Sequence, residues 1–385
     1  MKYFPDCLVF LCIFILTLRT KKGLILKEET ILRSVDVESL TPGMILARSI
    51  INDDMIVVLS EGTMLTKAHI TRLGFLGIPS VYVKDEYELS EAFQNVAAIF
   101  NPASAFVTEY KEVIHTAREI FDEAGKNDKP PVKKSKTMVK DTLAPMAKQS
   151  GAIDYLLEVN HLASDIYNHS VRVSVLAGVL AKWMMLSASE TQDLILAGFL
   201  HDIGKTKFPQ RLLDKQVEHL KGEDLDAYMQ HTIDGHRILN TSSELSEGVK
   251  LTALQHHECM DGSGFPFNLK GDDIHMYARI IGLANLYDNI TTEREGQKKN
   301  TPFTAIDQIT QDMYTKLDPH VCVPFLKHLK ETFLGSRVML SNGQIGNIVR
   351  YENDFSSKPL IRVTQKEIVD LNKNPEIKIV EYNPK

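Results

Sequence analysis

The sequence predicts a mainly α-helical protein, with a small α+β module before the helices and a small β appendage after them. Apolar residues recur at helical spacing over long stretches between Ile153 and Phe333. Short apolar runs separated by glycine or proline turns, which are typical of strands, flank that region on both sides. A chain of 385 residues is long enough for two or three such units.

The composition is that of a globular protein, with 43% hydrophobic and 24% charged residues. The net charge of −6 offers no electrostatic basis for binding nucleic acid. The four cysteines are Cys7, Cys12, Cys259 and Cys322. They lack CxxC spacing, which argues against a disulfide framework or a thiolate zinc site. We therefore expect a reducing, cytoplasmic compartment.

Residues 8–18 (LVFLCIFILTL) form a continuous apolar run, which is followed by Arg19, Lys21 and Lys22. Positive charge in this position is typical of the cytoplasmic end of a membrane anchor. A membrane span, however, needs about 20 apolar residues. We therefore expect residues 1–30 to be an N-terminal extension, and the alternative is an inner-membrane anchor formed by residues 8–18.

Residues 31–85 predict a small α+β module. A Pro-Gly turn interrupts the stretch Val37–Ala47, and a hairpin follows over Ile50–Leu59. Thr66 then begins a helix, and the strand Ser80–Val83 comes after it.

Residues 86–150 predict a connector that is helical as far as Glu123. The stretch Gly125–Ser150 then combines three prolines with several lysines, and both features oppose compaction. We expect a flexible basic linker here, and the alternative is a nucleotide- or phospholipid-binding patch.

Residues 151–333 predict an all-helical domain, and residues 334–385 predict the small β appendage. The expected helices span 153–162, 165–183, 189–200, 224–239, 246–257, 276–291 and 304–317. The expected strands span 337–340, 345–351, 360–363 and 377–382.

The stretch Ala197–Lys207 (AGFLHDIGKTK) carries the first chemical signal. An apolar helix ends at His201 and Asp202, and Lys205 follows. An imidazole beside a carboxylate offers a divalent ion one nitrogen and one oxygen, which suits zinc, iron, manganese or nickel. Two ligands do not make a site, so other helices must supply more.

Four further histidines have a similar setting. His169 lies in the apolar segment NHSVRVSVLA, His231 begins HTIDGHRIL, and the pair His256-His257 ends a helix. Any one of them alone is more often structural than a ligand. Because all adjoin apolar helical segments, they can converge at the centre of one bundle, where carboxylate–histidine metal sites are commonly built.

The loop after these histidines, HHECMDGSGFP, is the most specific signal. Asp261 can bond backbone amides in a tight turn, and Gly264 and Pro266 flank the aromatic Phe265. Because the turn directly follows His-His-Glu, it predicts a shaped pocket beside the metal centre.

Read in order, HS at His169, LHDIGK, HxxxG from His231, HHExxDGSGFP and ARIIGLANLYDNITTER resemble the motifs of the HD-GYP family. This family belongs to the HD superfamily of metal-dependent phosphohydrolases. The resemblance covers Asp165–Tyr314 and implies an HD-type helical bundle. It further implies a phosphodiesterase that converts cyclic di-GMP to pGpG and often on to GMP, with two or three iron or manganese ions.

The resemblance extends to other parts of the chain and to partners. Residues 31–85 are similar to a small domain of unknown function that often precedes this family. Besides cyclic di-GMP, the resemblance admits GGDEF-type or other signalling proteins as partners, and also a homodimer.

Position by position, the resemblance implies roles for most of the residues singled out above. The implied metal ligands are His169, His201, Asp202, His231, His256 and His257. Lys205 matches the lysine beside the metals and the substrate phosphate, and Arg294 adds a second positive charge there. The implied pocket residues are Asp261, Gly264, Phe265 and Pro266, with Phe265 in place of the tyrosine of GYP.

Two positions depart from the family pattern at the metals. Asp165 stands where some members have a glutamate that recruits a third ion, and an aspartate is shorter. Asn285 stands where the family has a metal-binding aspartate, while Asp288 and Arg294 of the same motif are retained. A neutral amide carbonyl can coordinate a metal but holds it less strongly than a carboxylate does.

The function expected from the sequence is therefore a metal-dependent cyclic di-GMP phosphodiesterase. One alternative is a catalytically weakened member that acts as a cyclic di-GMP receptor or a protein-interaction scaffold. It rests on Asn285 and on Gly296 and Gln297, which replace the tyrosine and the second arginine of the family's RPYR. Another is an HD phosphohydrolase that acts on a different nucleotide. His231, the pair His256-His257 and the Gly-Phe-Pro loop argue against this last alternative, because a plain HD domain does not need them.

Overall fold

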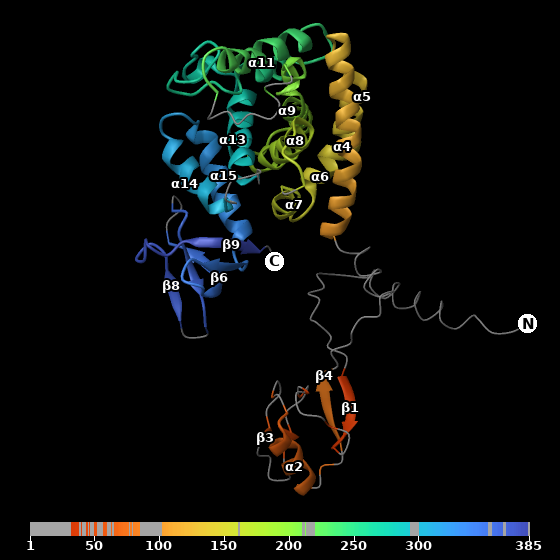
Figure 1. Cartoon of the computed structure of the whole chain (residues 1–385), viewed down its shortest axis with the longest axis vertical. Helices are drawn as coiled ribbons and strands as arrows, with labels where there is room; N and C mark the ends of the chain where they lie inside the picture. Colours follow the sequence, from red (N-terminus) through yellow and green to blue (C-terminus); the bar gives the residue numbers. More distant parts are fainter. Residues whose placement is uncertain are drawn as a thin grey trace, which may run out of the picture. The chain divides into compact units, whose positions relative to one another are not determined.

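The computed structural model (Figure 1) describes residues 32–37, short stretches up to 84, and then 102–160, 162–209, 212, 220–292, 300–352, 356–364 and 367–383. The chain divides into two compact units, Met1–Val96 and Ala97–Lys385. The apolar run at 8–18 and Arg294 lie outside the described residues.

The first unit is a small α+β fold. Strand β1 (Leu32–Asp36) pairs antiparallel with β4 (Ser80–Lys84), and β2 (Ile50–Ile51) pairs antiparallel with β3 (Val57–Leu59). Helix α2 (Lys67–Phe75) buries Leu73 against side chains of β1 and β4. The expected hairpin, helix and last strand are all present.

The second unit consists of helices from residue 102 to residue 333, followed by a β-sheet. Its α-helices are α4 (Pro102–Asn127), α5 (Val132–Met138), α6 (Ala144–Lys148), α7 (Ala152–Val159), α8 (Ile166–Trp183), α9 (Ala188–Leu200), α11 (Glu223–Leu239), α12 (Glu247–Gln255), α13 (Met276–Thr291), α14 (Pro302–Asp312) and α15 (Pro319–Phe333). A π-helical turn, η2 (Val139–Leu143), and two 3₁₀ turns, η3 (Ile203–Lys207) and η5 (Gly271–Asp273), lie between them. The mainly helical fold class is confirmed.

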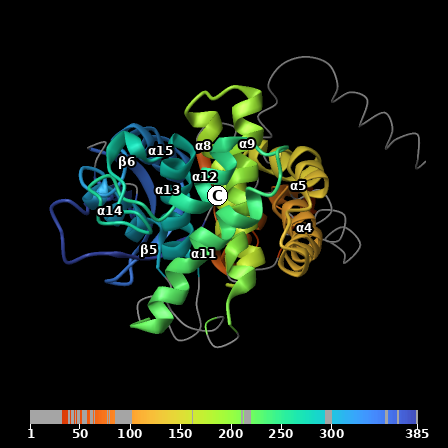
Figure 2. The same cartoon turned by 90° about the horizontal axis from the view of Figure 1, so that it is seen from above.

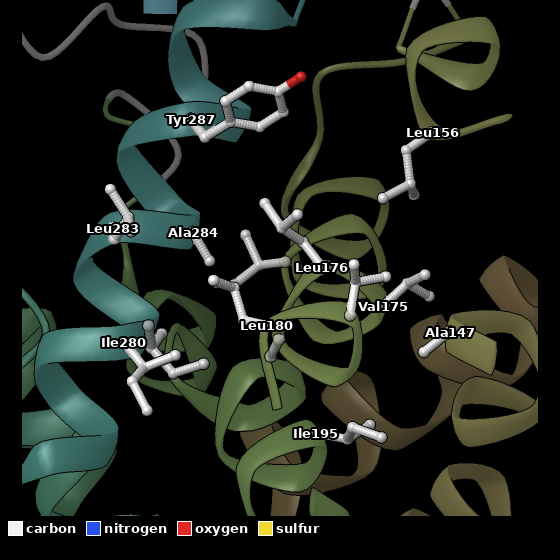
Figure 3. Close-up of a cluster of buried hydrophobic side chains, with 14 of the residues drawn as sticks. Ala147, Leu156, Val175, Leu176, Leu180, Ile195, Ile280, Leu283, Ala284 and Tyr287 are labelled. Atoms are coloured by element: carbon white, nitrogen blue, oxygen red, sulfur yellow. The ribbon is translucent and has the colours of Figure 1, made fainter. Parts of the chain in front are cut away.

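Helix α8 lies at the centre of the helical body. All its residues from Asn168 to Ala181 are buried, since α4, α6 and α9 pack on one side and α13 on the other (Figure 2). Figure 3 shows Leu176 and Leu180 of α8 directed toward Ala284 of α13. This apolar packing fixes the helix on which His169 lies.

Residues 125–150 form packed helices, so the prediction of a flexible basic linker is wrong. Hydrophobic side chains such as Met138 recur at helical spacing and are buried, while most of the lysines lie on the exposed side. Pro131 is the N-cap of α5, where the missing N–H of proline costs no helical hydrogen bond. Pro145 lies just after the π-helical turn η2, inside a helical stretch that runs without interruption from Val132 to Lys148. Composition alone cannot distinguish these placements from a helix break.

Several helix boundaries differ from the prediction, and α7, for example, ends at Val159 and not at 162. Ser187, and not Ser189, caps α9: its hydroxyl accepts from the backbone N–H of Glu190, whose side chain accepts from the Ser187 N–H in return. Helix α14 ends at Asp312, before the expected Leu317.

The C-terminal sheet is antiparallel with strand order β8-β7-β6-β5-β9. Its strands are β5 (Arg337–Leu340), β6 (Ile345–Tyr351), β7 (Pro359–Arg362), β8 (Ile368–Asp370) and β9 (Ile379–Asn383). Tyr382 of β9 packs edge-on against Phe303 and Phe333, and its hydroxyl donates to Asp154 of α7 at 2.6 Å. The sheet therefore packs on the helical body (Figure 1). None of the helices described here combines the length and apolar character needed to cross a membrane.

Candidate metal centre

The predicted metal-ligand residues come together from four helices of the second unit. His169 lies on α8, His201 and Asp202 at the junction of α9 and η3, His231 on α11, and His256 and His257 at the end of α12. The turn η3 approaches α11 so closely that a Cβ on Gly204 would lie 1.9 Å from the carbonyl oxygen of His231. The glycine of the HDIGK motif therefore allows Asp202 to reach the histidines of the next helices.

Asp202 is the centre of this cluster and is 1% exposed. Its Oδ2 lies 3.5 Å from Nε2 of His169 and 3.4 Å from Nε2 of His201, and these two nitrogens are 3.2 Å apart. We call these three atoms the first triangle. Its Oδ1 lies 3.3 Å from Nε2 of His231 and 3.5 Å from Nε2 of His256, which are 3.4 Å apart. These form the second triangle, and His257 also lies in that group.

Hydrogen bonds on the far side of each ring direct the four Nε2 atoms toward Asp202. The partners of the Nδ1 atoms are Asp288 Oδ2 for His169, Gly198 O for His201, Tyr228 O for His231 and Thr252 O for His256. Because each Nδ1 carries the hydrogen, each Nε2 presents a lone pair. This is how metal-binding histidines are usually held.

The donor set fits a divalent metal. Lone pairs of imidazole and carboxylate that face one another repel unless a cation lies between them, and Asp202 Oδ1 is buried with no hydrogen-bond partner among the described residues. Two donors about 2.1 Å from one ion, at angles between octahedral and tetrahedral, stand about 3.0–3.4 Å apart. The sides of both triangles, 3.2 to 3.5 Å, match this spacing.

The electrostatics favour the protonation states that metal ligands require. Burial lowers the pKa of His169, His231 and His257, and it lowers the pKa of His256 to about 3. Burial alone would raise the pKa of Asp202, but Lys205, with Nζ 2.5 Å from Oδ2, and His201 hold it well below its usual value. At neutral pH the imidazoles of the four histidines whose pKa is lowered are neutral and the carboxylate of Asp202 is charged, as metal binding demands.

The loop predicted to shape a pocket packs on the second triangle. Phe265 stacks on His257, with ring centroids 4.5 Å apart. A Cβ on Gly264 would lie 2.4 Å from the carbonyl oxygen of His257, so a glycine is needed there. Glu258 holds the loop by accepting from the backbone N–H groups of Phe267 and Leu269.

Other residues singled out in the sequence lie outside the two triangles. Asp165 caps α8, where its Oδ1 accepts from the backbone N–H of Asn168, and its part in a third ion site stays a prediction. Asp261 forms a turn by accepting from the backbone N–H of Ser263, and Pro266 follows Phe265 in the loop. Asn285 is buried on α13, and its Oδ1 accepts from Asn289 at 2.7 Å.

The sequence reasoning missed the support behind His169. Asp288 Oδ2 lies 2.7 Å from His169 Nδ1, and Arg172 Nε donates to Asp288 Oδ1 at 2.7 Å. The available signal was an arginine inside the otherwise apolar run VRVSVLA, which a helix tolerates only if the charge is paired.

Residues 156–321 match the family model described as HD domain. This part of the chain is similar to HD domains. Its boundaries enclose both triangles, Lys205 and the loop around Phe265, while the C-terminal sheet lies beyond them.

Several curated proteins are similar to part of this chain. A cyclic di-GMP phosphodiesterase of Pseudomonas aeruginosa is 28% identical over 258 residues, which are 64% of this chain and 62% of that protein. A cyclic di-GMP phosphodiesterase of Thermotoga maritima is 33% identical over 192 residues, 46% of this chain and 50% of the relative. A 3′3′-cGAMP-specific phosphodiesterase of Vibrio cholerae is 30% identical over 159 residues, 41% of this chain and 34% of the relative. The chain thus spans less than two thirds of the length of each of these relatives.

Proposed function

We propose that this chain is a metal-dependent phosphodiesterase that hydrolyses cyclic di-GMP to pGpG, with GMP as the further product. The observation that carries the proposal is the pair of ligand triangles that share the carboxylate of Asp202. Asp202 and the histidines would hold two ions side by side, and a two-metal site supplies stabilisation of the attacking and leaving oxygens in an in-line displacement at phosphorus. The similarity to two cyclic di-GMP phosphodiesterases supports this choice of substrate.

The cofactors in this proposal are two divalent ions, iron or manganese, one at each triangle. Mixed imidazole and carboxylate donors suit these metals. A third ion would need Asp165, whose Oδ1 already accepts from Asn168, so two ions are the simpler arrangement. When bound, the ions polarise the phosphodiester and make a water molecule nucleophilic at neutral pH.

The side chains of the chain bind and orient around that chemistry. Asp202 and the histidines hold their lone pairs toward the centre, and Lys205 places a positive charge where negative charge develops on the phosphoryl oxygens. Phe265 stacks on the ring of His257, and Gly264 lies against its carbonyl oxygen, so both flank the second triangle. The reaction adds water across one P–O3′ bond: the water oxygen joins phosphorus, and a proton goes to the 3′ oxygen.

Turnover by the full-length chain, purified without oxygen and loaded with iron or manganese, tests the proposal. Metal content is measured first, and cyclic di-GMP and 3′3′-cGAMP are then followed separately by chromatography of the products. We expect two ions per chain and pGpG from cyclic di-GMP, with slower cleavage of 3′3′-cGAMP. Preferred cleavage of 3′3′-cGAMP would move the substrate to the other cyclic dinucleotide.

The receptor alternative predicts a different result from the same sample. A chain that holds metal and binds cyclic di-GMP without cleaving it would be a receptor, and the phosphodiesterase proposal would be rejected. Light scattering of the same sample, with and without cyclic di-GMP, tests the predicted homodimer. Co-purification with a GGDEF-type protein tests the predicted signalling partner.

A further inference from the structure

His169 differs from the other three imidazoles that face Asp202 in what supports it. Gly198, Tyr228 and Thr252 offer neutral backbone carbonyls to the other rings, whereas His169 bonds the carboxylate of Asp288. A carboxylate behind an imidazole fixes the ring and makes its free nitrogen a stronger base. Among the described hydrogen bonds to these Nδ1 atoms, the bond from His169 to Asp288 is the one whose acceptor carries a formal charge.

Arg172 holds Asp288 in a fully satisfied network. Its Nε donates to Oδ1 at 2.7 Å, and its Nη2 donates to Oδ2 at 3.1 Å. The remaining bonds of the guanidinium go to the carbonyl of Ala163 and the hydroxyl of Thr292. The orientation of the carboxylate behind His169 is therefore fixed from both sides.

This ion pair is a poor device for stability alone. Arg172 is 1% exposed and Asp288 is 4% exposed. Removing both charges from water costs energy that the attraction between them often does not recover, and apolar replacements of buried pairs are frequently neutral or stabilising. The hydrogen bond between Asp288 and His169 gives the ion pair a role beyond packing, because it fixes an imidazole ring of the first triangle.

We propose that Asp288 and Arg172 are positioning residues that make the first triangle the tighter of the two ion positions. The inference rests on the proposed two-ion centre and adds that its two positions differ in affinity. Asp288 lies on the same face of α13 as Asn285, three residues further along. Its charge acts through His169 and offsets the neutral side chain at Asn285.

The main experiment neutralises the pair without leaving a buried charge unpaired. Arg172→Gln with Asp288→Asn keeps side chains of similar size, so it is the safer variant to fold, and Asp288→Asn alone is made beside it. Metal-free full-length proteins are titrated with Mn²⁺ and followed by electron paramagnetic resonance. Two bridged ions couple magnetically, whereas a single bound ion gives an uncoupled signal. We expect the affinity for one of the two ions to fall by about 10- to 100-fold in the double variant.

Further substitutions identify which ion is affected. His201→Ala removes a first-triangle ligand, and His256→Ala removes a second-triangle ligand. Added to His201→Ala, the neutral pair (Arg172→Gln with Asp288→Asn) should cause little further loss of metal affinity, since the first ion position is already lost. Added to His256→Ala, it should weaken the one ion that remains. The reverse pattern would overturn the proposal.

Ser174→Ala is the matched control for local packing. Ser174 is fully buried on α8, and its hydroxyl donates to the carbonyl of Val171 in the same helix, so it takes no part in the network of Asp288 and Arg172. We expect it to lower thermal stability slightly and leave both ion affinities within about twofold, the scatter usual for substitutions away from a ligand network. Equal metal loss in Ser174→Ala and in the double variant would reduce Asp288 and Arg172 to structural residues.

The wild-type titration separates this inference from the proposed function. If the wild-type chain binds one ion or none, the two-ion centre itself is rejected. If the wild-type chain binds two ions and the neutral pair binds both with unchanged affinity, the function stands and this inference fails.

Discussion

The two triangles around Asp202 present the same donor atoms but differ in what lies behind them. The first triangle has the carboxylate of Asp288 behind His169, and the ammonium group of Lys205 lies against the Oδ2 atom of Asp202. The second has backbone carbonyls behind its rings, an aromatic wall, and an Oδ1 with no hydrogen-bond partner among the described residues. Equal ligands therefore do not imply equal sites, because the charge behind a ligand is part of the site.

Removing the shared charge should have the largest effect, because it affects both triangles at once. Asp202→Asn keeps the shape of the side chain and loses the carboxylate that faces four imidazoles. We expect neither ion to bind and hydrolysis to fall on the order of 1000-fold or more, equivalent to about 4 kcal/mol of lost transition-state stabilisation. Metal analysis and cyclic di-GMP turnover measure this, with circular dichroism as the check on helical content.

Asp226→Asn is the matched control, since Asp226 lies exposed in the first turn of α11. It should retain both ions and full turnover. Two ions per chain in Asp202→Asn would show that each triangle holds metal without the shared carboxylate, and the comparison between the triangles would lose its basis.

Separating η3 from α11 should disturb the second triangle before the first. In Gly204→Ala the new Cβ would lie 1.9 Å from the His231 carbonyl oxygen and 2.6 Å from the backbone nitrogen of Gly235, so η3 must move away from α11. We expect the free energy of unfolding to fall by about 1–3 kcal/mol and the second ion to be lost more readily than the first. Urea unfolding and Mn²⁺ titration measure the two effects.

Gly74→Ala, where a Cβ would have nothing within 4 Å, is the control for a glycine replaced in open space. Because Gly74 lies inside helix α2, the alanine should raise the free energy of unfolding by about 0.5–1 kcal/mol. It should leave the ion affinities unchanged. Simultaneous loss of both ions in Gly204→Ala would mean that Asp202 itself moves away from both triangles.

Acid should destabilise the metal-free protein, and mainly through the second triangle. Burial lowers the pKa of His256 to about 3, and that of His231 and His257 also falls, whereas an unfolded histidine titrates near about 6.5. Below that pH the unfolded chain binds protons that the folded chain refuses, so the free energy of unfolding falls as pH falls. The limit is about 1.4 kcal/mol per pH unit for each such histidine.

Urea unfolding of the metal-free protein at pH 7.5, 6.5 and 5.5 tests this sign. His256→Asn removes one titrating group and should reduce the dependence on pH by up to one proton. Stability that rises on acidification, or a variant with the same dependence as the wild type, would contradict the assignment.

The ligand set could be predicted from the sequence because each residue sits at a helix end or on an apolar helix with a recognisable neighbour. Contacts across long sequence distances could not be predicted in this way. Asp288 is 119 residues from His169 and 116 from Arg172, and helical periodicity says nothing about such pairs. The segment 125–150 was predicted wrongly for a different reason: Pro131 caps a helix and Pro145 follows a π-helical turn within one, and composition alone gives the same signal as a linker.

Asn285→Asp should have the smallest effect of these substitutions, and it sharpens the comparison between the two triangles. Asn285 is buried one turn before Asp288 on the same face of α13, so a carboxylate there would add charge on the side of the first triangle. The side chains have the same shape, and the oxygen that accepts from Asn289 is retained. We expect metal affinity to rise by about tenfold, the lower end of what a supporting charge contributes, and turnover to rise with it.

The same substitution should have the opposite effect without metal, because a buried carboxylate near Asp288 is costly when no cation offsets it. The free energy of unfolding of the metal-free variant should therefore fall, while that of the metal-loaded variant rises. Asn300→Asp adds the same charge at an exposed position just before α14 and should change neither quantity. If Asn285→Asp and the wild type hold metal equally and turn over equally, the asparagine is tolerated, and the charge of Asp288 behind His169 already suffices for the first triangle.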